Sequence, residues 1–317
     1  MFSKILIANR GEIAVRIIRA CKEMGIATVA VFSEADRDAL HVNLADESVC
    51  IGSAAPRDSY LNMNAVISAA VLTGAEAIHS ENPKFVRLCE ECNIVFIGPS
   101  SHVIELMGDK DRARKTMQAA NVNVIPGCDL LKSLEDAKHQ AQRVGYPLLL
   151  KARAGGGGRG IRLVKEASEM ESAYRNATAE AQSAFGDGAV YMEKFLSPSK
   201  HIEMQILCDK YGHIVCLGER ECSVQRKNQK LLEESPSPSV SEEIRVKMVE
   251  QAVRAAEITG YENAGTIEFL MDSVGNFYFM EMNTRLQVEH PVTEMVTGVD
   301  LVKWQIRVAA GLPLGFT

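Results

Sequence analysis

Hydrophobic residues recur with two different spacings along the first hundred residues of the chain. A short apolar run at residues 4–8 is followed by apolar positions three and four apart from Ile13 to Met24, and Gly25 ends this helical pattern. The alternation continues with strands expected at 28–32, 49–51, 75–79 and 94–97 and helices at 63–72 and 83–92. Repeated strand–helix–strand units predict an α/β domain with a doubly wound parallel sheet and right-handed crossovers.

Two later regions follow other patterns. Residues 125–197 combine helical segments at 134–143 and 169–184 with apolar segments at 146–151, 161–164 and 189–195, which predicts a small α+β unit. From residue 198 we expect antiparallel strands at 202–207, 214–217, 266–271 and 277–282, a helix from Ser241 to Gly260 and a last helix at 300–310. The chain therefore divides into residues 1–100, a helical linker at 101–124, and the units 125–197 and 198–317.

Composition narrows the functional classes. Apolar residues make up 46% and charged residues 24%, as in ordinary globular proteins, and the net charge of −6 disfavours binding to nucleic acid. No apolar run reaches the ~18 residues of a membrane span, and the N-terminus lacks a signal-peptide core. We therefore expect a cytoplasmic protein that does not bind membranes. The eight cysteines should be reduced there, and Cys89 and Cys92, one helical turn apart, are interpreted as structural thiols.

A glycine-rich segment at residues 155–160 matches the letters of the dinucleotide-binding pattern G-x-G-x-x-G. That pattern requires a helix directly after the loop, whereas residues 161–164 alternate like a strand, and Glu180 lies in a helical stretch rather than at a strand end. The Walker pattern is also absent. With Lys151 just before it and Arg159 inside it, the segment is typical of a hairpin that closes over a triphosphate, and a plain flexible turn is the alternative.

A pair of carboxylates in the hairpin expected at residues 266–282 predicts a metal site. If the turn is centred at Val274–Gly275, Glu268 and Glu281 face each other across the strands, where like charges are destabilising. Asn283 shares a face with Glu281, so two carboxylates and an amide oxygen come together. Such oxygen ligands suit Mg²⁺ or Mn²⁺ on nucleotide phosphates, and solvated glutamates on an exposed face are the alternative.

The segment after this hairpin carries groups for acid–base chemistry. Arg285, Gln287 and Glu289 are expected on one side of an extended segment, where the Arg fork can hold a small anion and the Glu can act as general base. His290 precedes a proline and is interpreted as structural. A basic cluster at residues 225–230 would neutralise phosphate or bicarbonate, with a solvated surface turn as the alternative.

Further segments match one family in combination. They lie at residues 4–14, 107–110 and 191–195, at His201-Ile202-Glu203, and from Glu281 through Pro291, and together with the glycine loop they span essentially the whole chain. In these segments the sequence resembles the biotin carboxylases, which are ATP-grasp ligases of the acyl-CoA carboxylase family. The best match is the stand-alone bacterial subunit of acetyl-CoA carboxylase, which serves fatty acid biosynthesis. The same module occurs in pyruvate, propionyl-CoA and methylcrotonyl-CoA carboxylases.

The resemblance implies both a fold and a reaction. The N-terminal domain would precede an ATP-grasp fold, with a lid at residues 125–197 and a catalytic domain at 198–317. ATP would phosphorylate bicarbonate to carboxyphosphate, and the carbon dioxide released would carboxylate N1′ of biotin on a carrier protein. The implied cofactors are ATP and Mg²⁺ or Mn²⁺. The implied partners are a biotin carboxyl carrier protein, carboxyltransferase subunits and a second copy of the chain, with the helix of Arg16, Arg19 and Glu23 at the dimer interface.

The resemblance also implies roles residue by residue. Lys110, Lys151 and the loop glycines Gly155, Gly156, Gly157 and Gly158 would contact ATP phosphates, Glu193, Lys194 and Leu196 the adenine, and His201 and Gln225 the ribose. Asn228 would lie beside the nucleotide, where the family often has His. Glu268, Glu281 and Asn283 would hold the metal, and Lys230, Arg285, Gln287 and Val288 would surround bicarbonate. Glu289 would deprotonate bicarbonate, and Arg285 would stabilise the biotin enolate.

The sequence departs from the family in two further places. The family usually carries an insertion rich in glycine and aromatic residues between His79 and Ser80, which supplies a tyrosine near the substrate pocket. The chain ends at Thr317, where family members continue. We therefore expect a fragment, whose last helix would expose an apolar face around Val302, Ile306 and Val308.

Other functions stay open at this point. One alternative is a truncated chain that binds nucleotide without turnover, and another is the biotin carboxylase part of a pyruvate or propionyl-CoA carboxylase. A nicotinamide-dependent oxidoreductase is a third hypothesis, which the strand after the glycine loop disfavours.

Overall fold

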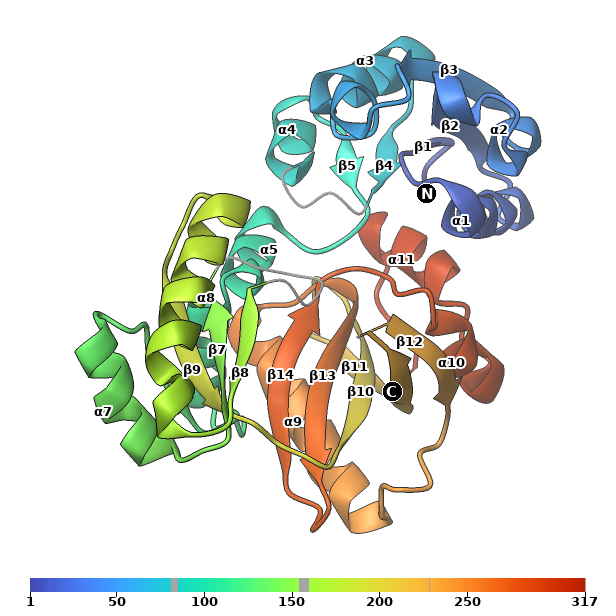
Figure 1. The fold of residues 1–317 in the computed structure, drawn as a ribbon. Coiled ribbons are helices and arrows are strands. Elements are labelled where there is room, and N and C mark those ends of the chain that lie inside the picture. The colour runs from blue at the N-terminus through green and yellow to red at the C-terminus, as the bar shows by residue number, and fades with distance from the viewer. Residues whose placement is uncertain (81–84, 154–159, 228, 317) are drawn as a thin grey trace.

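The computed structural model describes residues 1–80, 85–153, 160–227 and 229–316 (Figure 1). Its strands form three sheets, one parallel sheet of five strands, one of four strands and one antiparallel sheet of five strands. None of the helices in the described part of the chain is long and apolar enough to cross a bilayer.

The N-terminal sheet is parallel throughout. Its strands are β1 (Lys4–Ile7), β2 (Ala27–Ser33), β3 (Glu47–Gly52), β4 (Ala77–His79) and β5 (Val95–Phe96). Helices α1 (Gly11–Glu23), α2 (Leu40–Leu44), α3 (Met63–Thr73) and α4 (Val86–Glu91) lie between them in the chain. The strand order β3-β2-β1-β4-β5 reverses direction after β1, which confirms the predicted doubly wound sheet.

Two helices, α5 (Ser101–Gly108) and α6 (Lys110–Ala119), lead into the four-stranded sheet. Its strands are β6 (Gly127–Cys128), β7 (Leu148–Ala152), β8 (Ile161–Val164) and β9 (Val190–Lys194), in the order β6-β9-β7-β8. Helices α7 (Leu134–Val144) and α8 (Met170–Phe185) share an apolar core with this sheet. Because β7 and β8 pair antiparallel, with Leu148 opposite Val164, the glycine run joins two strands of a hairpin, as predicted.

The second antiparallel sheet has the order β12-β11-β10-β13-β14. Its strands are β10 (Ser199–Cys208), β11 (Ile214–Arg226), β12 (Gln229–Glu234), β13 (Asn263–Asp272) and β14 (Phe277–Asn283). Helix α9 (Glu242–Thr259) packs its buried Met248 and Ala252 into the core of this sheet, and Ser241 caps it as predicted. The expectation that β11 ends near residue 217 was wrong, because the strand continues as a long hairpin with β12.

The predicted pairing of Glu268 with Glu281 in the β13–β14 hairpin is confirmed. Glu268 lies directly opposite Glu281, and Thr266 lies opposite Asn283. Beyond this point the pairing shifts by one residue, so that Phe269 faces Phe279. The irregularity between Glu268 and Phe269 therefore places the two carboxylates opposite each other.

The C-terminal part of the chain differs from two expectations. Residues 285–291 are not wholly extended, because α10 (His290–Thr297) begins within them, with Pro291 in its first turn, where a missing N–H removes no helical hydrogen bond. In α11 (Leu301–Ala309), Val302, Ile306 and Val308 are buried rather than exposed. They pack in one hydrophobic core with β1 and α1 of the N-terminal domain.

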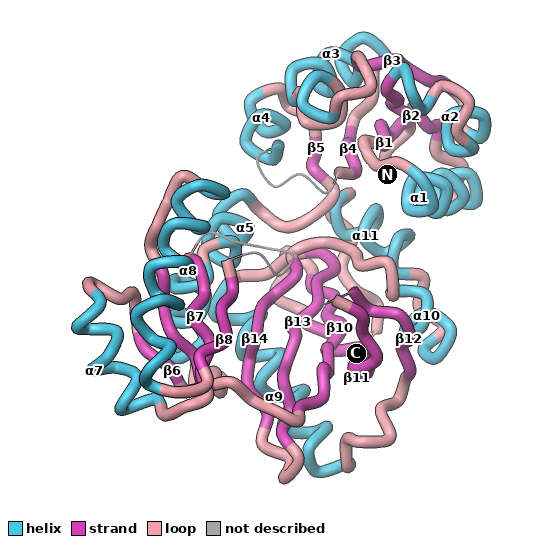
Figure 2. The backbone as a smooth tube through the Cα atoms, in the orientation of Figure 1, coloured by secondary structure: helices cyan, strands magenta, loops and turns pink. Residues whose placement is uncertain are grey.

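Figure 2 shows α11 beside the N-terminal domain, and polar side chains reinforce this junction between the two ends of the chain. On α1, Arg16 pairs with Glu294 and Asp300, and Glu23 pairs with Lys303. Arg16 and Glu23 are thus engaged within the chain, whereas Arg19, the third residue expected at a dimer interface, is exposed. His79, at the end of β4, is buried between Asn9 and Gln305.

Candidate active site

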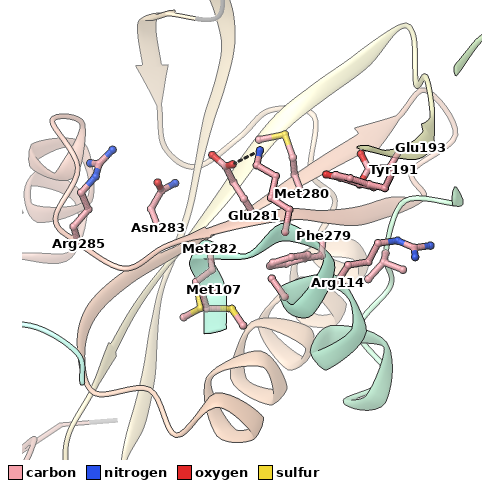
Figure 3. Close-up of a pocket in the computed structure, with 14 residues that line it drawn as sticks. Met107, Arg114, Tyr191, Glu193, Phe279, Met280, Glu281, Met282, Asn283 and Arg285 are labelled. Carbon is pink, nitrogen blue, oxygen red and sulfur yellow. Dashed lines mark ion pairs between the residues drawn. The ribbon is translucent and has the colours of Figure 1, made fainter. Parts of the chain in front are cut away.

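A cleft of about 300 Å³ lies between the four-stranded sheet and the C-terminal antiparallel sheet (Figure 3). Helix α6 contributes Lys110, strand β9 contributes Glu193, and strand β14 contributes Glu281 and Asn283. The ammonium of Lys110 lies 3.6 Å from the Glu281 carboxylate, and Arg285 lies at the other end of the lining. The cleft thus brings together five residues that the sequence assigns to nucleotide, metal and substrate.

Lys151 and Glu193 form a buried ion pair at the side of this cleft. They reach each other because β7 and β9 are neighbouring antiparallel strands, with Leu149 opposite Glu193. The other predicted nucleotide residues of this region are placed differently. Lys194 turns its ammonium to the carbonyls of Gly145 and Tyr146, and Leu196 is half-buried. The loop glycines Gly155, Gly156, Gly157 and Gly158 lie outside the described residues, as does Asn228.

A second cluster surrounds the ammonium of Lys230 on β12. Its Nζ lies 2.6 Å from Glu203, 2.9 Å from Glu268 and 2.7 Å from Glu289. Burial opposes the charge on Lys230, but the charges of Glu268 and Glu203 raise its pKa well above the ordinary value. The alternative of a solvated surface turn does not hold for Lys230, because it is a strand residue whose ammonium lies among three carboxylates.

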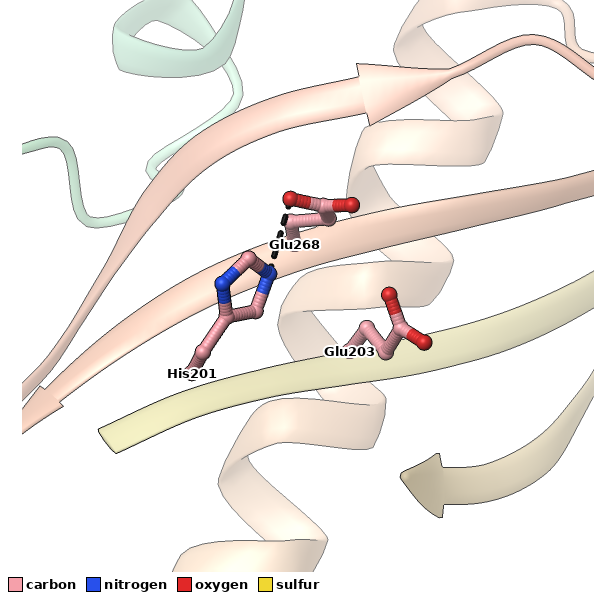
Figure 4. A group of neighbouring side chains, drawn as sticks. All are labelled: His201, Glu203 and Glu268. Carbon is pink, nitrogen blue, oxygen red and sulfur yellow. Dashed lines mark ion pairs between the residues drawn. The ribbon is translucent and has the colours of Figure 1, made fainter. Parts of the chain in front are cut away.

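Glu268 is the most heavily bonded carboxylate of this cluster (Figure 4). Its Oε1 accepts hydrogen bonds from Lys230, Asn283 and Gln287, and its Oε2 lies 2.8 Å from Nε2 of His201. Burial alone would raise its pKa, but the hydrogen bond and charge of His201, together with Lys230, lower the pKa to about 2. Glu268 is thus held ionised. Gln225 donates to Nδ1 of His201, so the predicted ribose pair does lie together.

The predicted metal residues present the oxygen donors that a hard divalent cation prefers. Glu268 and Glu281 face each other across the hairpin, and Glu281 lines the cleft. Asn283 donates its Nδ2 to Glu268, which directs its amide oxygen away from that carboxylate. These residues fit Mg²⁺ at the junction of the cleft and the Lys230 cluster.

The side chains of residues 285–289 do not all lie on one side, although the sequence predicted this for Arg285, Gln287 and Glu289. Gln287 and Glu289 do point into the Lys230 cluster, through Glu268 and Lys230 respectively. Arg285 is exposed, with a bond from Nη1 to the Leu286 carbonyl, and Val288 is 62% exposed. Burial would raise the pKa of Glu289, but the hydrogen bond and charge of Lys230 hold it below the usual value, so this candidate base is ionised.

His290 and the segment after His79 bear on two further expectations. The Nδ1 of His290 lies 2.7 Å from the Gln287 carbonyl and the ring is buried, as its structural interpretation predicts. Ser80 lines a separate cavity with Arg10 and Tyr60. The residues that follow Ser80, 81–84, lie outside the described part of the chain.

Sequence reasoning did not assign a role to Arg220, which is completely buried beside the cluster. It bonds to Glu203 and to Gln287, and Glu203 in turn reaches Lys230. The charged triplet Glu219-Arg220-Glu221 was a signal that could have been used. It lies inside a strand, where buried charges are kept only when they are paired.

Comparisons with known proteins give a consistent result. Residues 1–104 match the family described as "Biotin carboxylase, N-terminal domain", and residues 109–317 match "Carbamoyl-phosphate synthase L chain, ATP binding domain". The chain is 56% identical to the biotin carboxylase of Nostoc sp. and 54% identical to biotin carboxylase 1 of Bacillus subtilis. These alignments cover 100% and 99% of the chain and 72% of each relative.

Solved structures agree. A biotin carboxylase from Campylobacter jejuni, described as a complex with beta-gamma-ATP, superposes with a TM-score of 0.97 at 51% identity. The match covers 100% of the chain and 72% of that structure. The biotin carboxylase domain dimer of the Hydrogenobacter thermophilus 2-oxoglutarate carboxylase, described with MgADP, ADP and bicarbonate, superposes with a TM-score of 0.96 at 54% identity. It covers 100% of the chain and 71% of that structure.

Proposed function

The chain belongs to the biotin carboxylase family of ATP-grasp ligases, and we propose that it carboxylates carrier-borne biotin with bicarbonate in an ATP-driven reaction. One observation carries this proposal. The cleft with Lys110 and Glu281 adjoins the cluster of Lys230 and Glu289, and Glu268 on the shared hairpin lies next to both. A nucleotide phosphate in the cleft would therefore lie beside a buried base and cation.

In this proposal the cleft holds ATP. Lys110 and Lys151 would contact the phosphates, and the β9 edge from Glu193 to Leu196 would contact adenine. Two observations support this placement. Lys110 and Glu193 both line this cleft, and Lys151 is held next to it by its buried ion pair with Glu193. His201, held by Gln225, would stand on the ribose side.

We propose Glu268, Glu281 and Asn283 as the residues that hold Mg²⁺, and Mn²⁺ would suit the same oxygen donors. The cation would neutralise phosphate oxygens as the γ-phosphoryl group is transferred. The chain's own contribution is to keep Glu268 ionised, through His201 and Lys230, and to hold it opposite Glu281.

The Lys230 cluster would bind bicarbonate and take its proton. Glu289, which is ionised beside Lys230, would accept the proton of bicarbonate. A bicarbonate oxygen would then attack the γ-phosphorus of ATP, and the bond between that phosphorus and the oxygen that leaves with ADP would break. The product, carboxyphosphate, breaks down to carbon dioxide and phosphate. N1′ of biotin would then lose its proton to the released phosphate and form a bond to the carbon of carbon dioxide. Gln287 and Lys230 supply donors for the anion, and the exposed Arg285 and Val288 stand where the carrier-borne substrate would approach.

The proposed assembly includes a biotin carboxyl carrier protein, carboxyltransferase subunits and a homodimer, within acetyl-CoA carboxylase. The domain division at residues 100, 124 and 197 is part of the same proposal. It is supported by the three separate sheets of the fold.

The test is ADP release with ATP, Mg²⁺ and bicarbonate, with and without free biotin. We expect turnover that requires bicarbonate, rises with biotin and is lost in Glu289→Gln. Glu243→Gln, which changes an exposed carboxylate on α9, is the matched control and should leave turnover unchanged. ADP release that does not depend on bicarbonate, or that survives Glu289→Gln, would contradict the proposal.

A further inference from the structure

Arg220 is the most completely enclosed charged side chain near the proposed bicarbonate site. It lies on β11 with no exposed surface. Its guanidinium donates to five side chains, Glu203 at 2.9 Å, Gln205 at 2.8 Å, Thr293 at 2.7 Å, Thr266 at 3.4 Å and Gln287 at 3.1 Å. These acceptors come from β10, β13, α10 and the loop before α10, so one group joins four segments of the chain.

The bond from Arg220 fixes which way the Gln287 amide points. A guanidinium only donates hydrogen bonds and stays charged in proteins, so the Gln287 atom that faces it must be the oxygen. The NH₂ group must then face the opposite way, where it donates to Glu268 at 3.0 Å. The amide therefore presents a donor, and not an acceptor, to the site proposed for a negatively charged substrate.

The two carboxylate oxygens of Glu203 bind different cations, Arg220 and Lys230. Oε1 accepts from Nε of Arg220, and Oε2 accepts from Lys230 at 2.6 Å. Both carboxylate oxygens are thus engaged by cations, and Glu203 holds Lys230 at a fixed distance from Arg220. Because Glu203 and Arg220 are both fully buried, neither can relax into water if its partner is lost.

We propose that Arg220 is the positioning residue of the bicarbonate site, because it sets the donor direction of Gln287 and, through Glu203, the location of Lys230. The proposal rests on the proposed function for the identity of the anion. Arg220 itself does not touch the substrate. Its loss should therefore weaken use of bicarbonate selectively, while the nucleotide cleft, whose lining does not include Arg220, keeps its affinity.

The first test is Arg220→Lys, which keeps a charge but lacks the planar fork that reaches five acceptors. We expect the KM for bicarbonate to rise at least about tenfold while the KM for ATP changes less than about twofold. A purely structural role would instead lower the amount of active enzyme and leave both KM values unchanged. Wild-type values for both KM are measured in parallel.

Arg245→Lys is the matched control. Arg245, on α9, also donates more than one hydrogen bond to a buried carboxylate, that of Glu219, the residue before Arg220 on β11. This contact joins β11 to α9 and does not involve the residues of the proposed bicarbonate site. We expect this variant to lose stability and to keep both KM values. A rise in its KM for bicarbonate comparable with that of Arg220→Lys would overturn the proposal.

A milder pair of variants covers the case in which Arg220→Lys does not fold. Thr293→Val removes one hydrogen-bond acceptor of Arg220 at nearly constant shape, and Thr293→Ser restores the hydroxyl. We expect a KM for bicarbonate raised roughly threefold in the first and close to the wild-type value in the second. Equal values in folded Thr293→Val and wild type would count against the positioning role.

A binding measurement separates this inference from the proposed function. Sodium bicarbonate should raise the melting temperature of the wild type above that in sodium chloride of the same ionic strength, and Arg220→Lys or Thr293→Val should reduce this shift. If the wild type does not turn over but shows this variant-dependent shift, the proposed reaction fails and the positioning role stands. If bicarbonate stabilises wild type and variants equally, or none of them, the positioning role is refuted.

Discussion

Replacing Lys230 by methionine should destabilise the protein strongly, because three buried carboxylates share its ammonium. At 2.6, 2.9 and 2.7 Å, each attraction is worth roughly 6 kcal/mol at an effective dielectric constant of 20, before desolvation offsets most of it. Removing one partner of a buried pair leaves uncompensated charge, and we expect a loss of about 3–5 kcal/mol in unfolding free energy at pH 8.

The loss should depend on pH in a defined direction. In the wild type the pKa of Glu268 in the folded protein lies at about 2, below its ordinary value of 4.5. The stabilisation that its charge contributes is therefore complete above pH 4.5 and is lost as the pH falls toward 2. In Lys230→Met the same carboxylates repel one another, and their folded pKa values should rise. As the pH falls, these carboxylates take up protons in the variant before they do in the wild type, and their repulsion is removed. The difference in unfolding free energy between variant and wild type should therefore shrink between about pH 6 and 4.

The assay is urea unfolding followed by far-UV circular dichroism and by the fluorescence of Trp304, at pH 8 and pH 5. Lys200→Met is the control, because its ammonium is half exposed and bonds to Glu221 alone, and it should cost less than about 1 kcal/mol. Lys230→Met/Glu289→Gln removes one repelling charge and should recover about 1–2 kcal/mol. A loss below about 1 kcal/mol for Lys230→Met, or one that does not vary with pH, would refute the reasoning.

Three further predictions follow from other groups. Glu281→Gln should raise the Mg²⁺ concentration for half-maximal ATP hydrolysis about tenfold, because the cleft loses a charged oxygen ligand; an unchanged requirement would argue against a metal there. Lys151→Met should cost about 2–4 kcal/mol by leaving Glu193 buried and unpaired, and adding Glu193→Gln should restore the melting temperature but not the KM for ATP. Iodoacetamide at pH 8 should label the exposed Cys50 and Cys92, whereas burial raises the pKa of the other six thiols; peptide mass spectrometry would show whether any of them reacts.

The sequence was most informative where local spacing decides the structure. The pairing of Glu268 with Glu281 was predicted from the assumed turn position, and the structure confirms the pair. It also shows that the strand irregularity after Glu268, which was not predicted, is needed to bring the two residues opposite each other. The rejection of the dinucleotide fingerprint also holds. Glu180 lies within α8, where it pairs with Arg162 and accepts a hydrogen bond from the backbone of Gly160.

The errors arose where a distant partner decides the structure. The apolar face of α11 was expected to be exposed, yet α1 from the other end of the chain and strand β13 of the antiparallel sheet pack against α11 and bury that face. The basic cluster at residues 225–230 was expected to neutralise phosphate or bicarbonate, with a solvated surface turn as the alternative, and no carboxylate partner was foreseen. Lys230 is instead enclosed by Glu203, Glu268 and Glu289, which no local pattern connects.

The packing of α11 on α1 has a consequence for the order in which the protein can fold during synthesis. The N-terminal sheet is translated first, but Ile17 and its neighbours on α1 complete their core only with Leu301 and Ile306. At roughly 5–20 residues per second, the ribosome needs many seconds to add that helix. Until then, the part of α1 that α11 covers is left exposed on the nascent chain. A chaperone that binds apolar surface would have its longest access there, and premature release at any codon before α11 would leave a parallel sheet without its final covering helix.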